Sequence, residues 1–142
     1  MAADPDIRSL VPHAGRMCLL ERIVDWTADS VRCATATHRD PSNPLATPAG
    51  LHAVHLCEYG AQAMAVHGGL CARRGGPPPP GMLVSLREVV LHVDELRSLE
   101  GELEVAAERV QASEEAWQYR FVVRHAGREI AAGRATVALR RA

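Results

Sequence analysis

Four consecutive prolines, Pro77 to Pro80, separate two parts of this sequence that have different patterns. Proline has a fixed φ and no backbone N–H, so neither a helix nor a central strand can continue through "GGPPPPG". The part before the prolines holds one long, mostly apolar helical pattern, and the part after them holds only strand patterns. The chain is therefore expected to contain a single long helix and no βαβ repeat.

Strand patterns occur on both sides of that helix. Two are expected before it, around residues 20–26 and 31–35, joined by a hairpin across "TADS". Four follow the prolines, at residues 82–93, 101–110, 116–125 and 128–141. In the first of these four the apolar alternation changes phase, which predicts a β-bulge near Arg87 and Glu88.

This order of elements predicts an α+β fold, with about six mostly antiparallel strands curled around one central helix. Such an arrangement is the hot-dog architecture, and the 142 residues are expected to form one domain over 1–142. Because a curled sheet of this kind leaves an edge strand open, pairing with a second copy is expected, as a homodimer or a higher oligomer.

Composition excludes several classes of function. No apolar run reaches the ~20 residues of a membrane span, and the N-terminus lacks the pattern of a signal peptide, so a cytoplasmic protein is expected. The formal net charge is −1 and the basic residues are dispersed, so no nucleic-acid partner is expected. The four cysteines follow no metal-binding spacing and are expected to be free thiols.

The helix itself carries an unusual polar stripe. Thr47 and Pro48 suit an N-cap and a first helical position, and the helix is expected to end between Gly68 and Arg74. At 100° per residue, three polar residues of this helix fall within about 60° of one another. They are His55, Glu58 and Gln62, and the apolar residues Val54, Cys57, Ala61 and Met64 lie on another side.

Two readings of the stripe are open. The stripe faces solvent, or it lines an internal site, in which case an unpaired polar group would cost roughly 2 to 7 kcal/mol. The surrounding residues are small and apolar rather than charged, which favours the internal site. His52, His55 and Glu58 recur every three residues, but helical zinc pairs use a spacing of four, so no metal is expected. The amides near His52, including that of Ala53, lie where the helix start could face a substrate oxygen.

Two stretches resemble a known family. "LVPHAGRMCLLERIVDW" resembles the opening of 3-hydroxyacyl-[acyl-carrier-protein] dehydratases of the hot-dog superfamily, and "CEYGAQAMAVHGG" resembles their central-helix motif, an acidic residue followed four residues later by glutamine. The similarity is closest to the dehydratase-like branch associated with aryl-polyene biosynthesis. It extends from about Arg8 to Leu139.

The resemblance implies a dehydratase that acts on a 3-hydroxyacyl thioester, carried on the phosphopantetheine of an acyl-carrier protein or of coenzyme A, with no other cofactor. By position, Glu58 matches the catalytic carboxyl residue and Gln62 the glutamine that orients it. In this family a histidine removes the C2 proton, and amides at the helix start, where Ala53 lies, polarise the thioester. Its active sites lie between the subunits of a dimer.

One departure from the family concerns the base. The family's loop histidine lies about fourteen residues before the carboxyl residue, and Pro44 occupies that place here. His52 and His55 are the nearest substitutes for the base, and His38 is a third. His13 matches a family position that is interpreted as structural.

The sequence leaves three functions in competition. The opening motif and the Glu58–Gln62 pair favour a dehydratase, and the missing loop histidine favours a hot-dog thioesterase in which Glu58 activates water or attacks the thioester. The third is a non-catalytic acyl-binding or partner subunit. For an acidic carrier protein, Arg73, Arg74 and Arg87 are the expected contacts.

Overall fold

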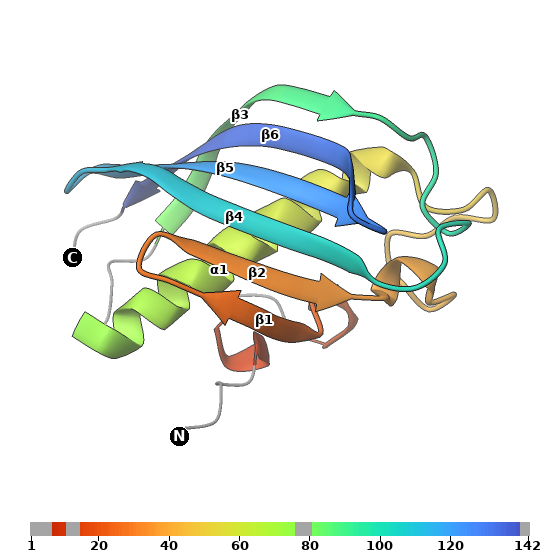
Figure 1. Cartoon of the computed structure of the whole chain (residues 1–142), viewed down its shortest axis with the longest axis horizontal. Helices are drawn as coiled ribbons and strands as arrows, with labels where there is room; N and C mark the ends of the chain where they lie inside the picture. Colours follow the sequence, from red (N-terminus) through yellow and green to blue (C-terminus); the bar gives the residue numbers. More distant parts are fainter. Residues whose placement is uncertain (1–6, 11–14, 76–80, 140–142) are drawn as a thin grey trace.

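The computed structural model describes residues 7–10, 15–75 and 81–139 of the chain. One helix packs on one face of a six-stranded sheet whose strands run in the order β1-β2-β4-β5-β6-β3 (Figure 1). Every neighbouring pair is antiparallel. The elements are β1 (Arg22–Trp26), β2 (Ser30–Thr35), α1 (Leu56–Gly75), β3 (Gly81–Leu91), β4 (Leu103–Ala112), β5 (Ala116–His125) and β6 (Arg128–Leu139). The predicted α+β hot-dog architecture is confirmed.

The expected β-bulge is also present in β3. The register between β3 and β6 shifts between Arg87 and Val90, and Glu88 has a φ of 54°, which confirms the bulge. Ala126 and Gly127, between β5 and β6, have φ values of 51° and 78°. Two consecutive positive φ angles are typical of the tight turn that matches the twist of a hairpin.

The prediction of the helix start was wrong. Thr47 and Gly50 exchange backbone hydrogen bonds, of 2.7 Å from Thr47 N–H and 2.9 Å from Gly50 N–H, and so close a tight turn instead of opening a helix. A short 3-10 turn follows at Ala53–His55, capped by His52, and α1 begins only at Leu56. Local residue preferences suited Thr47, but contacts with a distant loop hold residues 51–53 in another conformation.

The other end of α1 lies at Gly75, one residue beyond the longer of the two expected ends. The prolines that separate helix and strands, residues 77–80, lie outside the described residues.

The inner side of α1 fills the curve of the sheet, where the helix packs against β2, β4 and β5. The buried apolar side chains of the helix include Leu56, Tyr59, Ala63, Val66 and Leu70. Gly60 lets the helix approach β5 closely, because a Cβ there would lie 2.7 Å from the Phe121 ring. Among the four apolar residues that the sequence placed on another side of the helix from the polar stripe, Met64 is buried, whereas Val54 is 48% exposed.

The two edges of the sheet differ in their side chains. Most of the exposed large apolar side chains of the described residues lie on the edge strand β3: Met82, Leu83, Val84, Leu86, Val89 and Val90. An edge strand offers unpaired backbone groups, and an apolar one is a template for pairing with another chain. Within the described part of the chain, no helix combines the length and the apolar character that crossing a membrane requires.

Candidate active site

Gln62 is the best-anchored polar side chain of the helix. It is fully buried, and its Oε1 accepts a hydrogen bond of 2.8 Å from Leu19 N–H. Its Nε2 donates to the Met17 carbonyl at 2.6 Å and to Glu58 Oε1 at 3.2 Å. Both ends of the amide are therefore used, and one buried side chain ties α1 to the segment at Met17–Leu19 and to the carboxyl group one turn away.

Glu58 stands in the first turn of α1 and is partly exposed. Glu58 and Gln62 are four residues apart, so their side chains leave the same side of the helix. The structure brings these two predicted site residues together.

His55 and Glu58 also lie on one side of the chain. His55 is the last residue of the 3-10 turn and precedes Glu58 by three residues, a spacing that aligns side chains along a helix. Its side chain is partly buried, and its ring makes no hydrogen bond to any residue that the structure describes. Within the described part of the chain, the ring nitrogens of His55 are therefore available to a ligand.

His52 has a different position and role. It is exposed, and its Nδ1 accepts a hydrogen bond of 2.9 Å from Val54 N–H, so it caps the helix start. A nitrogen that accepts this bond carries no proton, so the hydrogen of the neutral ring lies on Nε2. The one lone pair with which His52 would act as a base is already in use.

Ala53 is buried, and its N–H donates to the Asp94 carbonyl at 2.9 Å. The amide that the resemblance assigns to the substrate thus already has an acceptor within the chain. Sequence reasoning missed this contact because Asp94 belongs to a loop that is distant along the chain, and no local signal marks such pairs.

The third candidate base, His38, lies in the interior. It is fully buried, its Nε2 donates to the Leu99 carbonyl at 2.8 Å, and its Nδ1 has no hydrogen-bond partner among the described residues. Burial lowers the pKa of this imidazole.

Pro44 occupies the place of the family's loop histidine, and its neighbour Asn43 donates from its side-chain amide to the Tyr59 hydroxyl at 3.1 Å. His13 lies outside the described residues.

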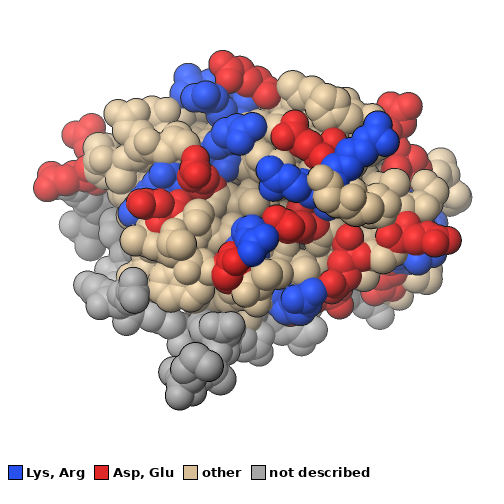
Figure 2. All heavy atoms as spheres, in the orientation of Figure 1, with Lys and Arg blue, Asp and Glu red and all other residues tan. Residues whose placement is uncertain are grey.

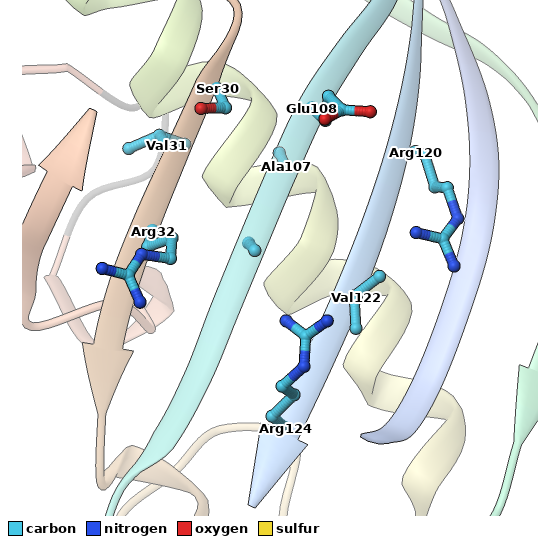
Figure 3. A pocket seen from close by; sticks show the side chains of 9 residues that line it. Ser30, Val31, Arg32, Ala107, Glu108, Arg120, Val122 and Arg124 are labelled. Atoms are coloured by element: carbon cyan, nitrogen blue, oxygen red, sulfur yellow. The ribbon is translucent and has the colours of Figure 1, made fainter. Parts of the chain in front are cut away.

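Arginines gather on one face of the sheet, and acidic side chains pair with two of them. A shallow hollow of about 230 Å³ over β2, β4 and β5 is lined by Arg32, Arg120 and Arg124 (Figure 3). Arg32 forms ion pairs with Asp25 and with Glu104, which also lies 3.8 Å from Arg124. Figure 2 shows acidic and basic side chains interspersed on one face of the molecule, which is typical of a solvated surface.

The arginines expected at a carrier protein are placed only in part. Arg87 lies on β3 and donates to Gln118 Oε1 at 3.1 Å. The side chains of Arg73 and Arg74 lie outside the described part of the structure. Among the described residues, no group of histidine, cysteine and acidic side chains is arranged to hold a metal ion.

Solved structures with a similar fold include dehydratases and thioesterases. The chain superposes on the dehydratase heterocomplex ApeI:P from Xenorhabdus doucetiae with a TM-score of 0.84 and 22% identity, covering 98% of this chain and 93% of that chain. A hypothetical thioesterase from Streptococcus pneumoniae TIGR4, solved with coenzyme A, gives a TM-score of 0.65 and 13% identity, covering 84% of each chain. At these identities the likeness establishes the fold alone.

Sequence comparison establishes the family. No curated protein matches the chain in sequence. The model of the ApeP-like family, described as ApeP dehydratase, matches residues 5–141. That match includes the helix with Glu58 and Gln62 and all six strands. This chain therefore belongs to the ApeP-like dehydratase family.

Proposed function

We propose that this dehydratase removes water from a 3-hydroxyacyl thioester at Glu58, with His55 as the base. The observation that carries the proposal is the anchoring of Glu58 by the buried amide of Gln62, with His55 one turn before it on the same side of the helix. The substrate class follows from the family, and the acyl group would be carried on a phosphopantetheine arm, either of an acyl-carrier protein or of coenzyme A.

The reaction needs one acid and one base. His55 takes the C2 proton of the substrate, and the electron pair that remains forms the C2–C3 double bond. The C3–O bond breaks as Glu58 gives its proton to the leaving hydroxyl, so the products are the 2-enoyl thioester and water. Gln62 donates to Oε1 of Glu58 and so orients the carboxyl group that gives this proton.

Hydrogen bonding favours His55 over His52 as the base. His52 would have to release Val54 N–H before it could accept a proton at Nδ1, and the helix start would then lose its cap. His55 makes no hydrogen bond to a described residue that it would have to give up. Glu58 is the acid with either histidine as the base.

We further propose that the apolar edge of β3 pairs with a second hot-dog subunit, as a homodimer or a larger assembly. Support comes from the exposed apolar side chains of β3 and from the solved relative, which is described as a heterocomplex. A homodimer and a mixed assembly with a related chain would use the same edge, and mass measurement of the purified protein separates them.

The experiment that tests the function is incubation of the purified protein with 3-hydroxyacyl thioesters on carrier protein and on coenzyme A, followed by mass spectrometry. Loss of one water in wild type, and its absence in Glu58→Gln, is the expected result. The matched control is Glu108→Gln, an exposed residue of β4 that is not part of the helix site. Release of free acid instead of water would identify a thioesterase, and an unchanged, tightly held substrate would identify an acyl-binding subunit.

A further inference from the structure

The helix start is attached to the loop of residues 94–98 by backbone hydrogen bonds. Leu96 N–H donates to the Leu51 carbonyl at 2.9 Å, and Ala53 N–H donates to the Asp94 carbonyl at 2.9 Å. His52 and Glu95 face each other in an antiparallel bridge. The backbone that leads into the 3-10 turn is therefore held as a short strand against this loop.

The carboxylate of Glu95 completes the attachment. Its Oε2 accepts hydrogen bonds from Leu51 N–H at 3.0 Å and from Arg97 N–H at 2.5 Å, and its Oε1 accepts one from Ser98 N–H at 3.2 Å. These backbone donors, that of Leu51 first, lower the pKa of Glu95. The group is an anion at neutral pH, which strengthens each of the bonds it accepts.

Gly50 shows that the chain leaves room for this carboxylate. Its φ is 121°, in a region that residues with a Cβ rarely adopt. A Cβ at this position would also lie 2.6 Å from Glu95 Oε2. Both the conformation and the close approach require glycine, so the turn and the carboxylate fit one another.

Two separate anchors thus hold the proposed acid and base. Gln62 ties Glu58 to residues 17–19, whereas Glu95 ties Leu51, four residues before His55, to residues 97 and 98. The distance between the acid and the base depends on both anchors. Displacement of a reacting group by about 1 Å costs on the order of 100-fold in rate.

We propose that Glu95 is a positioning residue for the dehydration: by holding Leu51, it sets the helix start that carries His55 relative to Glu58. This inference rests on the proposed function for its catalytic part. Glu95 acts through the backbone and does not itself touch the substrate.

The test compares Glu95→Ala and Glu95→Gln with wild type in steady-state dehydration. Alanine removes all three acceptor bonds, so kcat should fall about 10- to 100-fold while KM stays within about threefold. Glutamine keeps the size and one acceptor oxygen, which can serve Leu51 and Arg97, so it should recover most of the lost kcat. The matched control is Glu100→Ala, an exposed glutamate that follows the same loop and should leave kcat unchanged.

Amide hydrogen exchange supplies a readout that does not depend on activity. In folded Glu95→Ala, exchange at Leu51 and Ala53 should accelerate, while exchange at residues of β5 stays as in wild type. A wild-type kcat in Glu95→Ala, or unchanged exchange at Leu51, would overturn the inference. If wild type dehydrates no thioester, the proposed function fails, but the exchange of Leu51 still decides whether Glu95 holds the helix start.

Discussion

The Nε2 of Gln62 lies 3.2 Å from Oε1 of Glu58, and the Oε1 of Gln62 lies 2.8 Å from Leu19 N. A fully buried amide thus connects the proposed acid to the backbone of a segment far away in sequence. The same side chain serves the fold and the site, so its loss should affect both in a measurable way.

Replacement of Gln62 by alanine should destabilise the protein and slow dehydration. Leu19 N–H would lose its partner in the interior, and an unsatisfied buried donor costs about 1 to 3 kcal/mol. Urea unfolding measures the stability, and steady-state kinetics measure kcat on the folded protein. Gln111→Ala, at an exposed position of β4, is the control and should change neither quantity. Equal stability of Gln62→Ala and wild type would contradict the anchoring role.

The two histidines at the helix start should behave differently. His55→Ala should lower kcat by about 100- to 10,000-fold, the usual contribution of a general base, with little loss of stability. His52→Ala should keep most of the activity but lose roughly 0.5 to 2 kcal/mol, because the helix loses its cap. His52→Asn restores a capping acceptor and should recover that stability. Intact dehydration in His55→Ala would refute the assignment of the base.

The stability of the fold should decrease at acid pH because of buried histidines. His67 donates to the Ala28 carbonyl at 3.0 Å, accepts from the Tyr119 hydroxyl at 2.8 Å, and has a pKa lowered mainly by burial. His38 has a pKa lowered by the same cause. A histidine with a lowered pKa stays neutral in the folded chain, while the same histidine takes up a proton in the unfolded chain. The free energy of unfolding is therefore highest above the unfolded pKa of about 6.5 and declines as the pH falls below it.

Urea unfolding between pH 5 and pH 8 measures this decline, at up to about 1.4 kcal/mol per pH unit for each such histidine. His67→Gln should have a smaller slope below pH 6.5 than wild type, even where its stability at pH 8 is lower. An identical slope in the variant would show that the titration of His67 does not contribute.

The edge of β3 should control assembly. Val84 is 54% exposed, so Val84→Lys should leave the folding of a single chain intact and weaken pairing along this edge through charge and loss of apolar contact. Light scattering over a dilution series should then report a mass shifted toward one chain. Val110→Lys on β4, where the valine is 46% exposed, is the matched control and should assemble as wild type does. An unchanged mass for Val84→Lys would exclude β3 as the contact.

Features that depend on neighbours in sequence were predicted well. The spacing of the apolar residues and the run of prolines predicted two strands, then one helix, then four strands, and the structure has this order. The phase change in β3 predicted the bulge at Arg87 and Glu88. The pairing of Glu58 with Gln62 follows from a spacing of four residues on a helix, a local geometry that the sequence alone contains.

Contacts between distant segments were decided only by the tertiary structure. Thr47 has the local preferences of an N-cap, yet the helix begins later, because residues 94–98 hold residues 51–53 as a bridged strand and His52 becomes the cap. The anchoring of Gln62 at Leu19 and of Glu95 at Leu51 likewise joins residues more than forty positions apart. Residue preferences and periodicity act over a few residues, whereas these hydrogen bonds exist only after the sheet has curled and brought the loops to the helix.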